Sequence, residues 1–353
     1  MNSLPRLDAG RLLAEALGAP GTAPRSALTG DPWLLVDLEP HALPHAGERA
    51  ALTRWLQHQA CPVIGIAAGG LKHPLAFACD TVLEDAAQAG ELVRNIEATP
   101  LAAMVLVQVL RATEGLETEH ALVIESFAYA TLQGGTEFRR WLANAVRPAA
   151  QAGDEPEPPV LVERADAQLR LRLNRPARRN ALSVPMRDAL AEALELVLAD
   201  TSIAQVIVSG EGSCFSAGGE LAEFGSVADT ATGHAVRSAR SVAALLARCA
   251  PRLTVRVHGA AVGAGAEMAA FAARVEASAD AFFQLPELRY GLIPGCGGCV
   301  SIPRRIGRLR TAYLALSARR LDAGTACGWG LVDAVTPSLP ARASIASRLR
   351  RIH

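Results

Sequence analysis

Alternation of apolar and polar residues is clearest in the second half of the chain. Residues 160–173 end in the run LRLRL, in which every second side chain is apolar, as expected for a hairpin with one buried face. Residues 183–198 have apolar positions at helical spacing, with Ser183 as the predicted N-cap and Pro185 in the first turn. Two β-branched runs, 205–209 and 254–258, predict strands, and each precedes a glycine-rich turn and a helical pattern. Repeated strand–turn–helix units predict an α/β fold.

The first half predicts a smaller α/β, helix-rich unit. Residues 33–38 and 62–67 have the character of strands, and residues 101–111 and 119–132 have helical spacing. Between the halves, the acidic and proline-rich stretch QAGDEPEPP at 151–159 has no periodicity, which indicates a linker. The predicted domains are therefore 1–150 and 160–353, joined by 151–159.

Composition narrows the class of protein. The 353 residues, half of them hydrophobic, are enough for two domains with their own cores. Basic and acidic residues number 35 each, so net charge favours neither a nucleic-acid nor a membrane-surface partner. No apolar run reaches membrane-spanning length, and the N-terminal stretch lacks the pattern of a signal peptide. The seven cysteines form no paired framework, which favours a reduced, cytoplasmic setting.

Two glycine-rich turns are the first candidates for chemistry. They read GEGSCFSAGG at 210–219 and HGAAVGAG at 258–265. Neither fits a nucleotide-phosphate motif, but small residues at a strand end let a ligand approach the backbone. Two backbone N–H groups there could bind a carbonyl oxygen that gains negative charge, helped by a helix dipole if the second turn opens a helix.

Two glutamates follow these turns. Glu267 lies just past the second turn and Glu287 twenty positions later. Two carboxyl groups near one site can divide acid and base roles or hold a water molecule, whereas a single glutamate usually lies at the surface. The CxxC pair Cys296 and Cys299 has no second ligand pair, so we expect no metal site. Cys296 is either a small packed residue or a reactive thiol in a first helical turn.

Five motifs in order carry a family resemblance. They are RPARRNAL (175–182), FSAGGEL (215–221), GAAVGAGAE (259–267), PELRYGLIPGCGG (286–298) and PRRIG (303–307). Together they resemble the enoyl-CoA hydratase/isomerase (crotonase) superfamily over about residues 160–335. The resemblance implies a crotonase-like β/β/α spiral core for the second half.

The resemblance also implies roles for named residues. The backbone N–H groups of Gly219 and Ala264 would form an oxyanion hole for the thioester oxygen of an acyl-CoA. Glu267 and Glu287 would be catalytic, and Gly295 would start a helix whose N-terminus points at the thioester. Coenzyme A would arrive as part of the substrate, with no separate cofactor. The substrate-binding residues would be Ala217, Gly218, Gly295, Arg175, Arg178 and Arg179, although the three arginines also suit a solvated surface.

The implied reaction is hydration of a 2-enoyl-CoA to a 3-hydroxyacyl-CoA, because the isomerases of this family typically lose the first glutamate. Two alternatives stay open: another reaction through the same enolate, such as isomerisation or C–C or thioester cleavage, and a non-catalytic protein that binds acyl-CoA. Family members tend to be trimers or dimers of trimers, so we expect a homo-oligomer.

Some features depart from the family. Glu220 replaces the usual aspartate, Ala264 replaces the usual glycine, and residues 341–353 stand where the family has several helices. Stretches of the first half are similar to a family core fragment and to these C-terminal helices; they are 75–80, 99–102, 125–129 and 137–141. Our hypothesis is a degenerate crotonase-like unit in residues 1–150 that supplies the missing cap, in cis or to a neighbouring chain. The alternative is an unrelated helical extension used for assembly.

Overall fold

The computed structural model describes residues 4–18, 24–38, 45–145 and 158–337. The chain forms two compact units, and each consists of several separate segments. Unit 1 comprises Met1–Val146, Phe224–Ala239 and Leu285–Arg319, and unit 2 comprises Arg147–Glu223, Arg240–Gln284 and Arg320–His353. This division differs from a split at 151–159, because helices from both halves of the chain pack together in unit 1. Most of the expected linker, and residues 341–353, lie outside the described residues.

Unit 2 is built on a six-stranded sheet in the order β12-β9-β7-β6-β5-β4. Strands β4 and β5 pair antiparallel, as the alternation predicted, and the other neighbours pair in parallel. Leu169, Leu171 and Leu173 are buried on one face of β5, which is the reason for the alternation. The strands are β4 (Val160–Ala165), β5 (Gln168–Leu173), β6 (Gln205–Gly210), β7 (Leu253–Val257), β9 (Arg274–Ser278) and β12 (Ala334–Thr336).

A three-stranded sheet, β11-β10-β8, completes the strands of unit 2. Its strands are β8 (Ala260–Val262), β10 (Phe282–Gln284) and β11 (Leu321–Asp322). Four helices accompany the two sheets: α7 (Val184–Ala199), α9 (Val242–Cys249), α10 (Ala264–Ala269) and α13 (Ala323–Trp329). The predicted start of α7 is confirmed, because the Ser183 side chain accepts a hydrogen bond from Met186 N–H.

Unit 1 contains a small parallel sheet in the order β1-β2-β3. These strands are β1 (Leu34–Asp37), β2 (Val63–Ile66) and β3 (Thr81–Leu83), and α1 (Ala9–Leu17) and α2 (Ala46–His58) belong to the same part of the chain. Leu34 and Val36 of β1 and Val63 of β2 are buried in one hydrophobic cluster with Leu52 and Leu56 of α2. The strands expected at 33–38 and 62–67 are therefore present.

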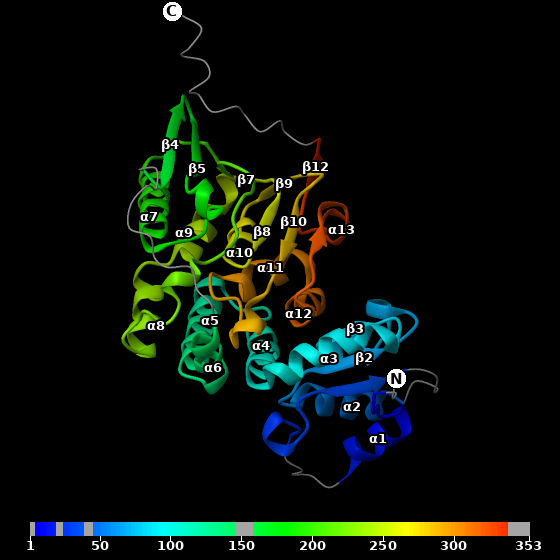
Figure 1. Cartoon of the computed structure of the whole chain (residues 1–353). Coiled ribbons are helices and arrows are strands. Elements are labelled where there is room, and N and C mark those ends of the chain that lie inside the picture. The colour runs from blue at the N-terminus through cyan, green and yellow to red at the C-terminus, as the bar shows by residue number, and fades with distance from the viewer. Residues whose placement is uncertain (1–3, 19–23, 39–44, 146–157, 338–353) are drawn as a thin grey trace, which may run out of the picture. The chain divides into compact units, whose positions relative to one another are not determined.

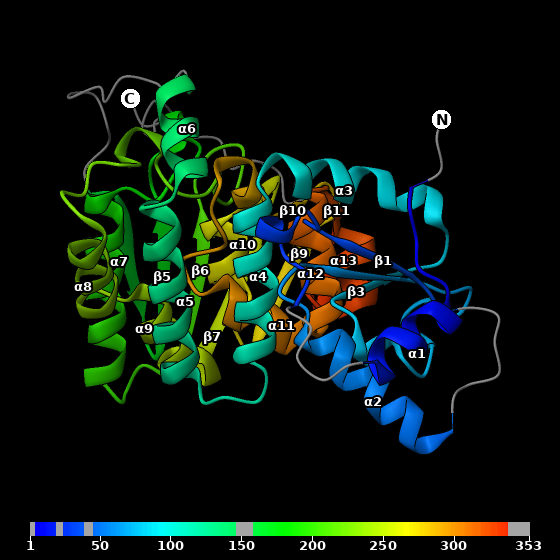
Figure 2. The same cartoon turned by 90° about the horizontal axis from the view of Figure 1, so that it is seen from below.

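The rest of unit 1 is helical and brings together residues from both halves of the chain. Helix α5 contacts α8 and α11, α4 contacts α11 and α12, and α3 contacts α12; α4, α5 and α11 are seen together in Figure 2. Figure 1 also shows α8 beside α5. Helices α4 and α5, which contain two of the stretches expected to resemble the family's C-terminal helices, therefore pack against α11 and α12 of the same chain. The elements are α3 (Ala89–Ala98), α4 (Pro100–Ala112), α5 (Thr118–Gln133), α6 (Thr136–Asn144), α8 (Thr230–Ala239), the 3₁₀ helix η8 (Glu287–Tyr290), α11 (Gly298–Ile306) and α12 (Arg308–Ser317).

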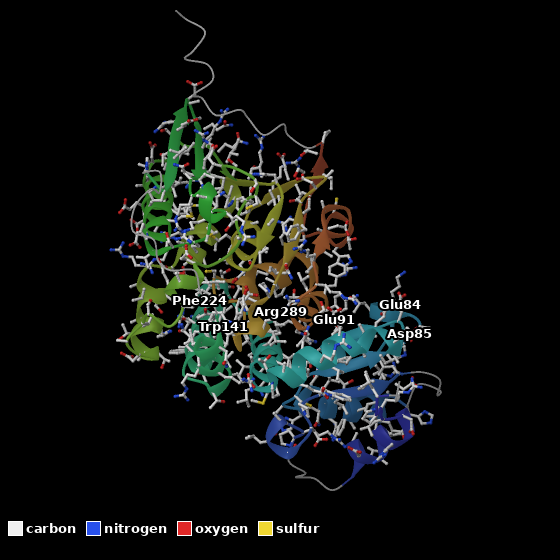
Figure 3. The ribbon with its side chains drawn as sticks, viewed as in Figure 1. Glu84, Asp85, Glu91, Trp141, Phe224 and Arg289 are labelled. Carbon is white, nitrogen blue, oxygen red and sulfur yellow. The ribbon has the colours of Figure 1, made fainter. Side chains whose placement is uncertain are left out.

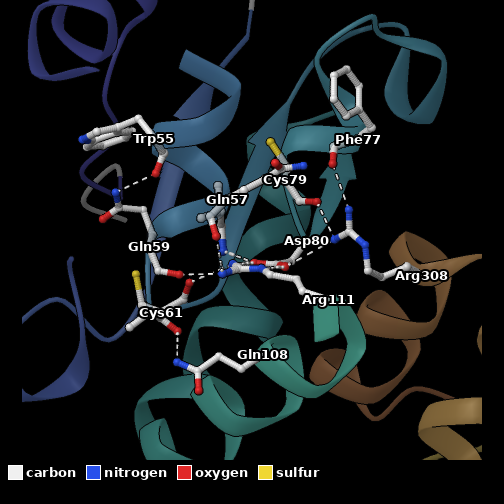
Figure 4. Close-up of polar contacts among 12 residues, drawn as sticks. Trp55, Gln57, Gln59, Cys61, Phe77, Cys79, Asp80, Gln108, Arg111 and Arg308 are labelled. Atoms are coloured by element: carbon white, nitrogen blue, oxygen red, sulfur yellow. Dashed lines mark hydrogen bonds and ion pairs between the residues drawn. The ribbon is translucent and has the colours of Figure 1, made fainter. Parts of the chain in front are cut away.

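A buried ionic cluster joins the small sheet to two of these helices (Figure 4). Asp80 precedes β3, is 1% exposed, and accepts hydrogen bonds from Val63 N–H (2.8 Å) and from Nε of Arg111 on α4 (2.8 Å). Arg308, the first residue of α12, lies 3.5 Å from Asp80 and donates to the carbonyl of Phe77 (2.8 Å). A buried charge that loses its partner is strongly destabilising, so these contacts bind the first and second halves of the chain in unit 1.

Helix length and composition decide whether a segment can cross a membrane. In the part of the chain that the structure describes, no single helix is long and apolar enough to cross one. The stretch Ala86–Ala98 with Pro100–Ala112 meets the criteria of length and composition only as a pair, and the two parts are bent by 109°.

Candidate active site

The two glycine-rich turns meet in unit 2. Ser216 N–H donates to the carbonyl of Ala260 (3.0 Å), and Val262 N–H donates to the carbonyl of Ser216 (3.0 Å). A Cβ on Gly218, whose φ is +99°, would lie 2.8 Å from the carbonyl oxygen of Val262. Only a glycine lets the backbones of the two turns approach this closely.

The pairing of Gly219 with Leu182 sets the direction of its N–H group. Leu182 N–H donates to the carbonyl of Gly218 (2.7 Å), and Glu220 N–H donates to the carbonyl of Leu182 (3.1 Å). Because successive N–H groups of an extended segment point to opposite sides, Gly219 N–H points away from Leu182. Within residues 158–337 it donates no hydrogen bond.

Ala264 presents a second donor beside the first turn. It is the first residue of α10, so its N–H has no acceptor inside the helix. Its nitrogen lies 3.8 Å from the position of a Cβ on Gly218, the residue next to Gly219. The expectation that the second turn opens a helix is confirmed, and the two predicted oxyanion-hole residues lie in adjoining turns of one unit.

Glu267 lies one helical turn from Ala264. It is 2% exposed, and its backbone N–H donates to the carbonyl of Gly263 (2.9 Å). Residues three apart on a helix share a face, so the side chain of Glu267 lies on the same face of α10 as that of Ala264. A buried glutamate is uncommon without a partner or a function.

Glu287 belongs to unit 1, where it opens η8 and is 9% exposed. The segment after it is fixed on α6, because Gly291 has a φ of +69° and a Cβ there would lie 2.7 Å from the backbone of Glu137. Burial and then the negative charge of Glu287 raise the pKa of the Tyr290 phenol.

The predicted helix at Gly295 is wrong. Helix α11 begins three residues later, at Gly298, after Gly297 as N-cap with a φ of +96°. Buried Glu125 of α5 accepts hydrogen bonds from the N–H groups of Gly297 (2.7 Å) and Cys299 (2.8 Å). A carboxylate of the protein itself thus caps this helix, which the sequence did not reveal because Glu125 is 172 positions from Gly297.

Gly295 is in contact with another residue of α5. The ring of Tyr129 occupies the space that a Cβ on Gly295 would need. Glycine is required here by close approach of an aromatic ring, and its φ is not in the left-handed range. Its predicted role in substrate binding stays a prediction.

The three predicted arginines have different surroundings in unit 2. Arg175 is 6% exposed and forms an ion pair with Glu220 (3.0 Å), so its charge is satisfied inside the unit. Arg178 is partly exposed and Arg179 is exposed. The carbonyl of Arg179 accepts a hydrogen bond from Ala217 N–H (2.9 Å), which connects this segment with the first turn. Only Arg178 and Arg179 are therefore open to solvent.

Unit 1 contains a pocket of about 370 Å³ that the sequence did not predict. Trp141 lines it and belongs to an aromatic cluster with Phe224 and Tyr290, whose ring centroids lie 5.9 and 5.0 Å away. Figure 3 labels Trp141 and Phe224. Two arginines contribute positive charge to the wall of the pocket. The lining residues are Asn95, Ala98, Thr99, Glu137, Arg140, Trp141, Asn144 and Arg289.

The cysteines of the CxxC pair have different environments. Cys296 is partly exposed, whereas Cys299 is buried and its thiol donates to the carbonyl of Pro294 (3.6 Å). Across the described ranges, no three His, Cys, Asp or Glu side chains are grouped to hold a metal ion.

Known proteins of the family that the motifs indicate are similar to this chain. The chain belongs to the enoyl-CoA hydratase/isomerase family, whose model matches residues 163–352. The predicted crotonase-like α/β fold class is confirmed by this membership. Homologues in this family are enzymes.

Individual relatives cover about half of the chain. The 2,3-dehydroadipyl-CoA hydratase of Escherichia coli is 36% identical over 179 residues, which are 51% of this chain and 69% of the relative. The 1,2-epoxyphenylacetyl-CoA isomerase of the same organism is 36% identical over 46% of this chain and 63% of its own. A crystal structure of enoyl-CoA hydratase from Mycobacterium smegmatis has 31% identity and a TM-score of 0.48, covering 51% of this chain and 71% of the other.

Proposed function

We propose that this protein is an enoyl-CoA hydratase, which adds water across the 2,3 double bond of a 2-enoyl-CoA thioester to give a 3-hydroxyacyl-CoA. The observation that carries the proposal is the pair of N–H groups of Gly219 and Ala264 in adjoining turns, with buried Glu267 one helical turn further on. The names of its hydratase relatives support the same reaction.

The two N–H groups suit the charge that develops during this reaction. When oxygen attacks C3 of the enoyl group, negative charge moves onto the thioester oxygen and forms an enolate. Two fixed donors stabilise that oxygen without rearranging, and one such donor contributes about 10²- to 10³-fold in rate. Alanine at position 264 keeps its N–H group, so its replacement of the family's glycine does not remove the donor.

The glutamates would manage the protons. In the proposed reaction the water oxygen bonds to C3, Glu267 takes the proton that leaves the water, and Glu287 delivers a proton to C2. Exchange with solvent then restores both carboxyl groups. The sum is one H and one OH added to the double bond, with CoA retained on the product and no separate cofactor needed. We further propose a cytoplasmic homo-oligomer.

A reaction panel with single variants tests the proposal. Loss of the conjugated thioester absorbance is followed with crotonyl-CoA, longer and aromatic 2-enoyl-CoAs and 2,3-dehydroadipyl-CoA. We expect Glu267→Gln and Glu287→Gln to lower kcat by about 10²- to 10⁴-fold, because each removes a group that transfers a proton. The matched control is Glu192→Gln at an exposed position of α7, which should leave kcat unchanged.

Two results would contradict hydration. If wild-type protein binds CoA esters but hydrates none of the panel, the function is another enolate reaction or acyl-CoA binding alone. If the double bond moves without uptake of water, as product analysis would show, the protein is an isomerase.

A further inference from the structure

Arg237 is a partly buried cation whose role is not explained by the proposed catalytic residues. It lies on α8, facing α5, where its guanidinium donates to Ser126 Oγ (3.2 Å), to the Ser126 carbonyl (3.4 Å) and to Gln133 Oε1 (3.0 Å). The same group lies 4.7 Å from the centre of the Tyr129 ring. All of these partners are neutral.

Among the described residues, Arg237 takes part in none of the ion pairs, although it lies in the field of Glu125. No carboxylate within the described ranges lies within 4.0 Å of its guanidinium. Glu125 is the acidic residue that faces it from α5, but the Glu125 carboxylate accepts the N–H groups at the start of α11. His234, on the same helix as Arg237, forms a hydrogen bond between its Nδ1 and Ser126 Oγ (2.9 Å). Burial lowers the pKa of Arg237, while the side chains of Tyr129, Cys296 and Glu125 raise it.

The geometry leaves part of the guanidinium available. An arginine has five N–H donors in a planar fork, and three hydrogen bonds are made here. A partly desolvated cation with unused donors gains more from an anionic ligand than a solvated one does. Two parallel hydrogen bonds to a carboxylate are the arrangement that this fork fits best.

Arg237 is also close to the segment that follows Glu287. Tyr129 joins the two, because its ring contacts both Gly295 and the guanidinium of Arg237. All of these residues belong to unit 1. An acyl chain with its reacting carbons at Glu287 and Gly295 would therefore have an aromatic ring and then a guanidinium beside its far end.

We infer that Arg237 binds an anionic group at the far end of the acyl chain, so that the preferred substrates are 2-enoyl-CoA thioesters with a terminal carboxylate. This inference rests on the proposed function for the position of the acyl chain. It assigns Arg237 a role in substrate choice and none in the proton transfers.

Binding of two saturated thioesters tests the inference without any turnover. Adipoyl-CoA and hexanoyl-CoA have acyl chains of equal length and differ in the terminal carboxylate. We expect wild-type protein to bind adipoyl-CoA about tenfold or more tightly than hexanoyl-CoA, measured by calorimetry. Arg237→Gln should weaken adipoyl-CoA binding by about 10- to 100-fold, the worth of a hydrogen-bonded charge, and change hexanoyl-CoA binding by less than about threefold.

Further variants exclude a purely structural role. Arg252→Gln is the matched control, since Arg252 is a partly buried arginine that donates to the neutral carbonyl of Ile203 in unit 2; it should leave both affinities unchanged. Arg237→Lys keeps the charge but not the fork, and should lower the preference for adipoyl-CoA by about threefold or more. If Arg237→Gln does not fold, the preference of Arg237→Lys for adipoyl-CoA over hexanoyl-CoA tests the inference instead. Equal loss of both affinities, or no preference in the wild type, overturns the inference.

The inference and the proposed function can fail separately. Hydration of 2-hexenoyl-CoA and 2,3-dehydroadipyl-CoA at equal rates, with equal binding of the saturated pair, would keep the hydratase and remove the role of Arg237. Preferred binding of adipoyl-CoA with no hydration of either enoyl ester would keep the role of Arg237 and remove the hydratase function.

Discussion

At the scale of single residues, the oxyanion-hole proposal depends on one backbone hydrogen at position 264. Ala264→Pro removes that N–H at the first residue of α10, where proline is well tolerated. We expect kcat to fall by about 10²- to 10³-fold with every substrate that is turned over, while circular dichroism shows little change.

The control for this prediction keeps the donor. Ala264→Gly retains the N–H and should hold kcat within about threefold of wild type, since the hole itself is unaltered. An Ala264→Pro protein as active as the wild type would remove Ala264 from the catalytic scheme.

The raised pKa values of two buried thiols lead to a prediction of how the stability of the protein depends on pH. Burial, and then the nearby charge of Asp80, raises the pKa of Cys61 and of Cys79 to about 12 in the folded protein, from an ordinary value of 9.0. Between these values the unfolded thiols lose their protons while the folded thiols keep them, so the free energy of unfolding falls as pH rises from about 9 to 12. Urea denaturation at a series of pH values should show a shallower fall for Cys61→Ala than for wild type. Parallel curves for the two proteins would contradict this.

The sequence pointed to both glycine-rich turns, and the structure places them side by side with a helix opening at the second; the catalytic role of their residues stays a prediction. The glycines at 218 and 219 and the alanine at 264 lie in short motifs where backbone geometry follows from side-chain size. The partner of Arg175 was not predicted, since Glu220 is 45 positions away and the contact exists only after the first turn folds back. Arg237 was not singled out either, because an arginine on an exposed helical pattern has no local sign of burial.

At the scale of elements, α11 depends on a residue of another helix. Glu125→Ala removes a buried carboxylate that accepts two N–H groups of α11. We expect the free energy of unfolding to fall by about 2–4 kcal/mol, because two buried donors lose a charged acceptor at a helix N-terminus. Urea denaturation measures the change. Glu119→Ala, at an exposed position on the same helix, should cost less than about 1 kcal/mol, and equal costs for both would contradict the capping role.

Most elements could be predicted from periodicity, whereas one helix start could not. The predicted helix at 119–132 corresponds to α5 (Thr118–Gln133), and the strand at 205–209 corresponds to β6 (Gln205–Gly210). The start of α11 was predicted at Gly295 from the family resemblance, and the local sequence IPGCGG contains three glycines, at 295, 297 and 298. Which glycine precedes the helix was decided by Glu125, a long-range contact that no local pattern contains.

At the scale of the whole molecule, unit 1 needs both halves of the chain. We predict that residues 156–353 expressed alone aggregate or lack activity, because α11 and α12 lose the cover of α4 and α5 and buried Arg308 loses Asp80. Size-exclusion chromatography and the hydration assay measure the result. Co-expression with residues 1–150 should restore soluble protein, whereas a folded and fully active 156–353 fragment would show that the cap is dispensable.

The division into two units could not be predicted from the sequence, because unit 1 combines segments from both halves of the chain. The proline-rich stretch at 151–159 separates the halves in composition, but compactness follows the contacts of buried surfaces. The buried side chains of α4 are apolar, but their pattern does not say which partner they cover. Helix α5 meets the start of α11 through the carboxylate of Glu125, and a single glutamate in a helical pattern does not indicate such a contact.

The discontinuous construction of unit 1 has a consequence for how the chain folds during synthesis. Hydrogen bonds between the first half of the chain and residues 297–317 of this unit join residues from 172 positions apart, for Glu125 and Gly297, to 231 positions apart, for Phe77 and Arg308. A ribosome that adds about 5–20 residues per second needs roughly 10 to 50 seconds to cover that distance. During this interval α4 and α5 have left the ribosome while α11 and α12 do not yet exist, so their apolar faces are open to chaperones and to neighbouring nascent chains.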